Sequence, residues 1–258
     1  MSINVILENS KIMKRVVDAM TSLSVELAIE ISDEGFRAQA HDVGNITAVD
    51  VFIHRENFAK YEVKGKNTFF IDQKDFTDFI KTARASDELN INVEDNKSTF
   101  NLSLSSKGMT KRISLRLLDI PEFKFFEIAK RDFPSSCRMD AELLSEAAKA
   151  TELGDEHVKL TISTKGLLFQ SISTTRTAEA NISFIENEQV ESTKVNEEPH
   201  VSTYSQRFLK QIAKLGKAGE ALSLGMGQNF PLRVIFDNIE GQNGYIAIVV
   251  APRDADSE

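Results

Sequence analysis

Two segments of the chain repeat one pattern at a constant spacing. Residues 32–40 (SDEGFRAQA) and residues 163–171 (STKGLLFQS) share a serine, a glycine and a glutamine, each pair 131 residues apart. Each segment predicts a strand, a tight turn at the glycine and a second strand. A pattern that recurs once in 258 residues predicts a chain made of two halves with similar local structure.

Four amphipathic helices match this repeat. Apolar residues at helical spacing predict a helix upstream of each segment, over 9–23 and 140–152, and a later one in each half, over 72–86 and 205–219. The expected N-caps of the last three are Asp140, Asp72 and Ser205. The apolar stripes are Ile12, Val16, Met20 and Leu23; Leu143, Leu144, Ala147 and Ala148; Phe76, Phe79, Ile80 and Ala83; and Phe208, Leu209, Ile212 and Leu215.

Alternating or apolar runs typical of strands occupy both halves. They are 25–31, 46–53, 89–93, 100–104, 113–117, 158–162, 180–184, 221–224, 232–236 and 245–250. Matched helices, strands and turns favour a duplication over a chance likeness between two α+β halves. The domains are expected at 1–117 and 135–258, with a connector at 118–134 that Pro121 and Pro134 keep irregular.

Positive charge is concentrated on one predicted helix of an acidic chain. The net charge is −8, which repels nucleic acid unless basic residues are gathered in one place. The window 205–219 has four basic residues and no acidic one, at spacings of 3, 4 and 3. These residues share one helical face and are Arg207, Lys210, Lys214 and Lys217. A solvated polar face is the alternative, but an acid-free stripe favours contact with phosphates.

The other three windows are less basic. The first helix has Lys11, Lys14 and Arg15 opposite its apolar face, against one acid. The window 72–86 balances three bases, including Lys81 and Arg84, with three acids, and Lys149 stands among four acids in 140–152. No groove-reading motif accompanies these residues, so contact with DNA is expected to involve the backbone and to be independent of sequence.

No group of residues predicts catalysis. The four histidines lack metal-ligand spacing, and Cys137, the only cysteine, is expected to be a buried structural residue in a reducing compartment. The first residues carry no secretory signal, and the apolar run 246–251 is too short to cross a bilayer. An internally duplicated enzyme or small-molecule-binding protein remains the rival interpretation; turnover or a bound cofactor would favour it.

Four short motifs, in this order, resemble the PCNA family of DNA sliding clamps over essentially the whole chain. They are Gln39-Ala40-His41-Asp42, Leu117-Leu118-Asp119-Ile120, Phe230-Pro231-Leu232 and Ala251-Pro252-Arg253. The short tail after Arg253 is closer to archaeal than to eukaryotic members.

The resemblance implies a fold and a function. Each half would be a clamp domain of the α+β class, with two helices packed on antiparallel sheets. Three copies would form a ring around double-stranded DNA, with the helices lining the hole. The chain would be no enzyme and would use no cofactor or metal. A subunit of a heterotrimeric or checkpoint-type clamp is the alternative within the family.

The resemblance also implies partners. DNA polymerase, clamp loader, nuclease and ligase would bind through short peptide motifs, with no membrane involved. The protein would be intracellular: in the cytoplasm or nucleoid if archaeal, in the nucleus if eukaryotic. The residues expected to face DNA are Lys11, Lys14, Arg15, Lys81, Arg84, Lys149, Arg207, Lys210, Lys214 and Lys217.

Two further sets of residues are implied in the same way. Subunits would join through strands at 109–117 and 174–184, with Lys111, Arg112, Ile113, Arg116, Ala178, Ala180, Ile182 and Phe184. The pocket for partner peptides would contain His41, Asn45, Ile46, Phe125, Ile128, Pro231, Val249, Val250, Ala251, Pro252 and Arg253. Two features depart from the family pattern: Val249 and Val250 stand where an aromatic residue is common, and the third helix is acidic.

Overall fold

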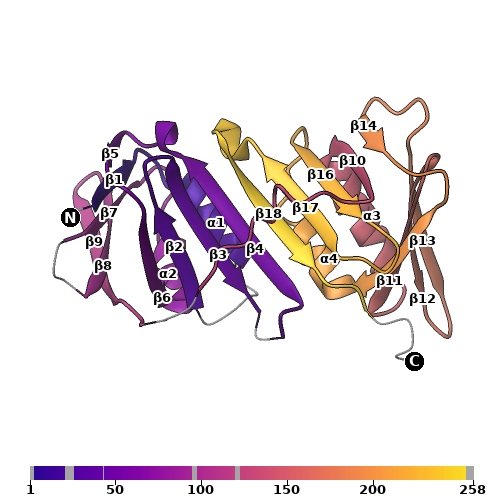
Figure 1. Ribbon diagram of the computed structural model, residues 1–258, viewed down its shortest axis with the longest axis horizontal. Helices are drawn as coiled ribbons and strands as arrows, with labels where there is room; N and C mark the ends of the chain where they lie inside the picture. Colours follow the sequence, from indigo (N-terminus) through magenta and orange to yellow (C-terminus); the bar gives the residue numbers. More distant parts are fainter. Residues whose placement is uncertain (1–2, 21–25, 43, 95–97, 120–122, 254–258) are drawn as a thin grey trace. The chain divides into compact units, whose positions relative to one another are not determined.

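The structure is a computed structural model that describes residues 3–20, 26–42, 44–94, 98–119 and 123–253. Two compact units make up the chain (Figure 1). Unit 1 comprises Met1–Glu127 and Asp237–Ile246, and unit 2 comprises Ile128–Phe236 and Ala247–Glu258. The connector expected at 118–134 is therefore divided between the units, and residues 237–246 belong to unit 1 rather than to the second half.

Unit 1 contains two helices and nine strands of its own among the described residues. They are β1 (Ile3–Leu7), α1 (Lys11–Met20), β2 (Glu26–Ile31), β3 (Gly35–His41), β4 (Thr47–His54), β5 (Lys60–Glu62), β6 (Asn67–Asp72), α2 (Gln73–Lys81), β7 (Glu88–Val93), β8 (Thr99–Ser106) and β9 (Met109–Arg116). Two short 3-10 turns, η1 (Arg55–Asn57) and η2 (Ile239–Gly241), also belong to it.

Unit 2 has the same composition of elements. They are β10 (Ser135–Asp140), α3 (Ala141–Thr151), β11 (His157–Ser163), β12 (Gly166–Ile172), β13 (Thr177–Ser183), β14 (Val190–Lys194), β15 (His200–Ser205), α4 (Gln206–Ala213), β16 (Ala221–Met226), β17 (Leu232–Asp237) and β18 (Gly244–Val250). The first residues of β18 are assigned to unit 1 and the rest to unit 2.

The strand order repeats between the units. Unit 1 has the order β5-β1-β7-β8-β9 in one sheet and the run β4-β3-β2-β6 in another. Unit 2 has β14-β10-β16-β17-β18 and β13-β12-β11-β15, so every strand has a counterpart at the same place. The strand pairs are antiparallel, as in β3 with β4 and β12 with β13. The α+β fold of two duplicated domains is confirmed.

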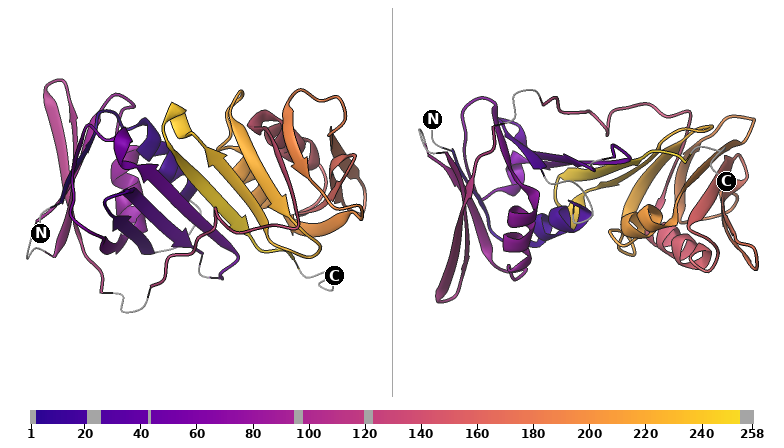
Figure 2. Two further views of the ribbon diagram at one scale, coloured as in Figure 1. Left: turned by 45° about the horizontal axis from the view of Figure 1, so that its top comes forward. Right: turned by 90° about the horizontal axis from the view of Figure 1, so that it is seen from below.

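Each unit buries a pair of adjacent helices against its strands (Figure 2). Ile12, Val16 and Met20 of α1 are fully buried, because the apolar positions recur on one helical face. Phe76 and Ile80 do the same for α2. Burial of each such side chain contributes roughly 1.5–3 kcal/mol, so these stripes fix how the helices lie on the sheets.

Three helix starts agree with the expected positions. The side chain of Asp72 accepts a hydrogen bond from the backbone N–H of Asp75, and Asp140 does the same for Glu142. Both satisfy a backbone donor that the first helical turn leaves unpaired. Ser205 occupies the N-cap position of α4, but its side chain makes no capping bond.

A glutamine joins the two helices within each unit. Gln73, the first residue of α2, donates its side-chain N–H to the carbonyl oxygen of Met20 at 2.8 Å. Gln206, the first residue of α4, donates to the carbonyl oxygen of Ala148 at 2.8 Å. Both glutamines are buried, and each satisfies a carbonyl near the C-terminal end of the first helix.

The glycines of the repeated segment have a different role from the one expected. Both follow the turn rather than form it, since Gly35 opens β3 and Gly166 opens β12. A Cβ atom on Gly35 would lie 2.2 Å from the carbonyl oxygen of Ile53, and one on Gly166 would lie 2.5 Å from that of Ile182. Glycine is required at both places because the neighbouring strand approaches so closely.

Several predicted bounds differ from the observed ones. Six strands without a clear alternating pattern were not expected, namely β1, β5, β6, β10, β14 and β15. The helices end earlier than expected: α2 at Lys81 and α4 at Ala213. The expected positions of Leu23, Val25, Ile120 and Pro121 lie outside the described residues. Among the described residues, no helix combines the length and the apolar character needed to span a bilayer.

Candidate functional site

In unit 1, two of the expected basic residues lie exposed on the helices. Lys11 is at the start of α1 and Lys81 at the end of α2, and both are exposed. Arg84 is also exposed but lies after α2 has ended. Lys14 is half-buried, and its Nζ donates to the carbonyl oxygen of Ala83 at 2.8 Å. Lys14 therefore joins α1 to the chain that follows α2.

The position expected for Arg15 is wrong. The sequence placed it on the solvent face of the first helix, but only 6% of its side chain is exposed. Its guanidinium forms an ion pair with Glu240 at 3.9 Å, within unit 1. Most other residues of α1 are buried too, so the buried face of this helix is wider than the apolar stripe. Arg15 is an internal ion-pair partner rather than a surface cation.

In unit 2, the expected basic stripe is shorter than the helical spacing indicated. Because α4 ends at Ala213, Lys214 is its C-cap and Lys217 lies in the following loop. This loop turns back toward the start of α3, where the N–H of Gly219 donates to Asp140 at 3.0 Å. Arg207 and Lys214 are exposed. The sequence predicted four basic residues on one face of this helix. The structure has three, if Lys214 at the C-cap is included, because Lys217 is not part of the helix.

The stripe is also not free of acidic neighbours. Lys210 forms an ion pair with Glu152, which follows α3. The helix itself carries no acid, so this pairing arises from the packing of α3 against α4 and not from the local sequence. Lys149 of α3 is exposed. An exposed ion pair of this kind contributes about 0–1 kcal/mol, but it lowers the positive charge that Lys210 offers to a ligand.

Both of the expected contact strands lie at the edges of their sheets. Within the described residues, β9 pairs only with β8 and β13 only with β12. A strand at an edge leaves a row of backbone N–H and C=O groups available for another strand. Phe184 lies just beyond β13, and its N–H donates to the carbonyl oxygen of Lys165 at 3.0 Å.

Side chains alternate on both edge strands. Arg112 and Arg116 of β9 are exposed, whereas Lys111 is half-buried and donates to the carbonyl oxygen of Thr82 at 2.6 Å. Ile113 is half-buried on the same side as Lys111. On β13, Ala178 and Ala180 are half-buried and Ile182 is buried, on the side that faces α3.

The residues expected for a peptide pocket are distributed over the two units. In unit 1, His41 is half-buried at the end of β3, and Asn45 and Ile46 are exposed in the turn before β4. Asn45 has a φ of 52°, in the left-handed region that asparagine tolerates better than most residues. Phe125 is half-buried, and the Arg37 guanidinium lies 5.3 Å from its ring centroid.

In unit 2, the expected pocket residues differ in exposure. Ile128 and Val250 are buried. Arg253 is exposed and donates its N–H to the carbonyl oxygen of Thr203 at 2.8 Å. Pro231, Val249, Ala251 and Pro252 are half-buried.

Arg233 is a functional candidate that the sequence did not reveal. Its Nη1 donates to the carbonyl oxygens of Ala129, at 3.1 Å, and of Arg131, and its guanidinium lies 4.4 Å from the ring centroid of Phe133. Burial lowers the pKa of this guanidinium. From the sequence, a basic residue in a strand is expected to face solvent. No sequence signal indicated that Arg233 instead binds the segment 128–133 within unit 2.

The described residues form no group of three or more histidine, cysteine, aspartate or glutamate side chains suited to a metal ion. Cys137 is buried in β10, and burial raises the pKa of its thiol to about 12. A thiol with this pKa is almost entirely protonated at neutral pH and is a poor nucleophile.

Comparison with known proteins identifies one family of similar proteins. Residues 2–123 match the family model for the proliferating cell nuclear antigen, N-terminal domain. The sliding clamp of Methanococcus vannielii, named a DNA polymerase sliding clamp, is 24% identical over 249 residues, which cover 95% of this chain and 96% of the relative. The chain resembles sliding clamps of the PCNA family over nearly its whole length.

Further relatives in the PCNA family agree. DNA polymerase sliding clamp 1 of Thermococcus kodakarensis is 25% identical over 255 residues, covering 98% of this chain and 99% of the relative. A structure of the C-terminal region of FEN-1 bound to A. fulgidus PCNA matches with a TM-score of 0.85 and 23% identity, over 99% of this chain and 100% of the other. PCNA from Thermococcus kodakaraensis matches with a TM-score of 0.84 and 18% identity, over 97% and 100%.

Proposed function

We propose that this chain is a non-enzymatic clamp of the PCNA family that closes into a ring of three copies around duplex DNA. It would slide along the duplex and hold DNA polymerase, clamp loader, nuclease and ligase through their short peptide motifs. The names of its relatives support a role beside DNA polymerase. The main support for a ring is that two strands, β9 and β13, lie at the edges of their sheets and could each pair with a strand of another copy.

The duplication explains why these two edges suit each other. By strand order β9 corresponds to β18 and β13 corresponds to β4. Within unit 1, the first residues of β18 already lie against β4: a Cβ on Gly244 would be 2.4 Å from the carbonyl oxygen of Phe52. This contact within unit 1, between the counterparts of β9 and β13, supports the pairing that β9 of one copy and β13 of the next would form. A contact between two different patches closes into a ring when the rotation between copies allows it.

Exposed cations on the helices support contact with the DNA backbone. Lys11 and Lys81 in unit 1, and Lys149, Arg207 and Lys214 in unit 2, remain exposed and able to reach phosphates. Contacts of this kind release counterions and weaken steeply with salt. They carry no sequence information, as a protein that slides requires. Arg15 does not belong to this surface because it is buried.

The docking of partner peptides is supported by the A. fulgidus PCNA structure, which contains the C-terminal region of FEN-1. The candidate residues on this chain are the half-buried and exposed members of the expected pocket. Ile46, with 40% of its side chain exposed, is one of the few large apolar residues that reach the surface. Exposed apolar residues on a defined surface favour a binding role.

The first experiment is the solution mass of the purified chain by light scattering across a range of concentrations. Three times the 28.8 kDa of one chain supports the homotrimeric ring. A persistent monomer rejects the homotrimer and favours a heteromeric clamp completed by sister subunits.

A matched pair of variants tests the edge of β13. Because the N–H of Phe184 donates to Lys165 across the β12–β13 pair, the N–H of Asn181 faces the other way, toward the available edge. Asn181→Pro removes that donor without touching the bonds to β12, whereas Asn181→Ala keeps it. We expect the proline variant to be monomeric and the alanine variant to keep the mass of the ring. Equal masses for both would exclude β13 as the joint.

A second pair of variants tests the contact with DNA. The double variant Arg207→Ala, Lys214→Ala should dissociate from circular DNA faster than the wild type. Its affinity should also depend less on salt: the slope of log affinity against log salt concentration should become shallower by about 0.9 for each phosphate that is no longer neutralised. Lys159→Ala combined with Lys165→Ala removes the same charge from exposed positions on and beside β11. An equal effect of both pairs would show that net charge, and not the helix surface, governs retention.

A further inference from the structure

The sheet face that carries Arg37, Gln39 and Asp50 is polar yet largely buried. On β3 and β4 the alternate residues, such as Ala38 and Val51, point to the other face and are fully buried. Gln39 pairs in register with Asp50, which has no exposed surface at all. Polar side chains on a covered face need partners, because burying a polar group without a hydrogen bond is unfavourable.

Arg37 neutralises Asp50 and reaches the connector at the same time. Its Nε and Nη2 donate to the two carboxylate oxygens of Asp50 at 2.8 and 2.9 Å, and Nη2 also donates to the carbonyl oxygen of Phe126 at 2.7 Å. Tyr245 donates its hydroxyl to Asp50 at 3.3 Å. A bidentate ion pair of this type fixes the guanidinium in orientation as well as in position. The Nη2 group that donates to Phe126 is therefore held in place.

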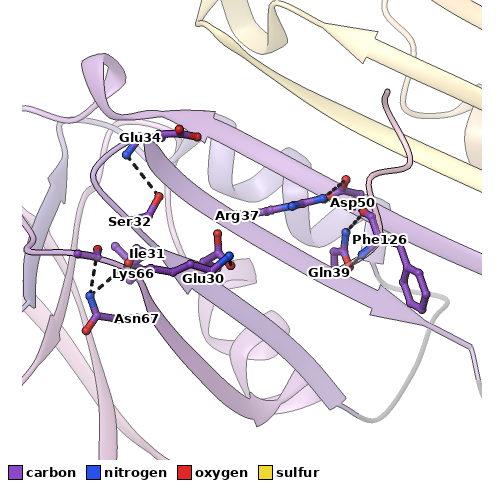
Figure 3. A network of polar contacts seen from close by, with 11 residues as sticks. Glu30, Ile31, Ser32, Glu34, Arg37, Gln39, Asp50, Lys66, Asn67 and Phe126 are labelled. Atoms are coloured by element: carbon purple, nitrogen blue, oxygen red, sulfur yellow. Dashed lines mark hydrogen bonds and ion pairs between the residues drawn. The ribbon is translucent and has the colours of Figure 1, made fainter. Parts of the chain in front are cut away.

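Gln39 completes the attachment. Its side-chain carbonyl accepts from the N–H of Phe126 at 2.9 Å, and its side-chain N–H donates to the carbonyl oxygen of the same residue. Both backbone groups of Phe126 are therefore bonded, as they would be beside a neighbouring strand. Figure 3 shows the resulting arrangement, with the Phe126 ring extending away from Gln39 and Asp50.

The aromatic residues of this part of the connector fall into two groups. Phe123 and Phe125 are half-buried: their ring centroids are 5.1 Å apart, and the Phe123 ring lies 5.5 Å from that of Phe70. The Phe126 side chain is 58% exposed although both of its backbone polar groups are hydrogen-bonded. The sequence named Phe125 for the peptide pocket and omitted Phe126. Phe125 packs beside Arg37 and Phe123, whereas the side chain of Phe126 is presented to solvent.

We propose that Arg37 and Gln39 are positioning residues that fix the connector on the sheet so that the Phe126 ring can receive an apolar side chain of a partner peptide. This inference rests on the proposed docking function. A ring fixed before binding costs less conformational entropy when the peptide arrives. Hydrogen bonds from both side chains converge on the backbone of one residue whose ring is exposed, which a purely structural connector does not need.

The test uses all 258 residues of the chain and a fluorescent synthetic peptide of the C-terminal region of A. fulgidus FEN-1. Gln39→Met keeps the size of the side chain but removes both bonds to Phe126. We expect the Kd to rise about five- to tenfold, the equivalent of one net hydrogen bond or slightly more. Gln170→Met is the matched control, since Gln170 is the counterpart of Gln39 in the repeat and bonds instead to Glu179 at 2.7 Å.

Two readouts separate positioning from a general loss of stability. Hydrogen exchange at the N–H of Phe126 should accelerate in Gln39→Met, while exchange in the strands stays unchanged. Phe126→Ala should weaken binding by itself, and Phe126→Leu should restore part of it. If Gln39 acts through Phe126, Gln39→Met should have no further effect on the Kd in the Phe126→Ala background.

The outcomes distinguish the inference from the function on which it rests. A wild-type chain that does not bind the peptide overturns the docking function and the inference with it. A wild-type chain that binds, together with a Gln39→Met variant of equal affinity, overturns the inference alone. Additive effects of Gln39→Met and Phe126→Ala would also overturn it, because they would show that Gln39 acts independently of the ring.

Discussion

The side-chain amide of Gln206 donates a hydrogen bond of 2.8 Å to the carbonyl oxygen of Ala148, which ties the first turn of α4 to the end of α3. Gln73 makes the equivalent bond to Met20 in unit 1. The two halves have little sequence in common around these residues, yet both contain the same contact. It holds each helix pair together at a carbonyl in the last turn of the first helix, where regular helical partners run out. The carbonyl of Ala148 also accepts a 3.3 Å bond from Oγ1 of Thr151 in the same helix.

Gln206→Ala should lower the free energy of unfolding. The substitution removes the 2.8 Å bond and leaves the carbonyl of Ala148 with the longer 3.3 Å bond from Oγ1 of Thr151. We therefore expect the loss of one buried hydrogen bond, about 0.5–1.5 kcal/mol. Urea unfolding followed by circular dichroism measures the change. Gln170→Ala, on the surface of β12, serves as the control and should cost less than about 0.5 kcal/mol. Equal costs would mean that the buried bond contributes no more than a surface one.

Gly166→Ala should destabilise unit 2 and disturb the pairing of β12 with β13. The new Cβ would lie 2.5 Å from the carbonyl oxygen of Ile182, so the backbone of one strand has to move. We expect a loss of about 1–3 kcal/mol, as for other overpacked sites. Gly44→Ala adds the same methyl group where the nearest atoms are 3.4 Å away. The ring mass of Gly166→Ala should fall as well, because β13 is the proposed joint.

Glu152→Gln should lengthen retention on DNA at low salt. The carboxylate of Glu152 pairs with Lys210, and its removal would make that ammonium available to a phosphate. Glu146→Gln makes the same change of charge on the exposed face of α3 and controls for the overall field. A larger gain for Glu152→Gln, measured as the dissociation rate from circular DNA, is the expected result. Identical gains would show that only net charge matters.

The protein should unfold at alkaline pH, in a pH range set by the raised pKa values of its tyrosines. Burial raises the pKa of Tyr204 from its ordinary value of 10.0 to about 12, and burial also raises the pKa values of Tyr61 and Tyr245. A raised pKa means that the folded state binds the proton more tightly, so this contribution to stability is complete below pH 10 and is lost as the pH rises toward 12. Phenolate absorbance should rise with unfolding rather than before it. Ionisation of all three tyrosines near pH 10 in a folded chain would contradict this prediction.

The sequence predicted the duplication because its signals are local: a glycine and a glutamine at one offset, and apolar stripes at helical spacing. Strands such as β1 and β10 were not predicted, because their alternation of buried and exposed positions is short and is obscured by polar residues. The ends of the helices were also missed. The spacing of basic residues continues past Ala213, but the chain turns there to reach Asp140, which is a tertiary contact.

The candidate site was less predictable for the same physical reason. Arg15 and Arg233 look like surface cations in the sequence, yet both are buried, because their partners come from distant segments. Gln39 stood out as part of the repeat and of the Gln39-Ala40-His41-Asp42 motif, but not as a residue that contacts the connector. Its bonds to Phe126 could not be inferred, because its counterpart Gln170 bonds to a residue on the adjacent strand.

The edges of β9 and β13 are made of different residues, and this has a consequence for direction. A joint between unlike edges gives each copy a leading and a trailing side, so all copies in a closed ring would run the same way round. The two flat sides of such a ring are then chemically distinct. Every enzyme held on one side would meet the duplex with the same orientation relative to the ring, whichever copy it occupied.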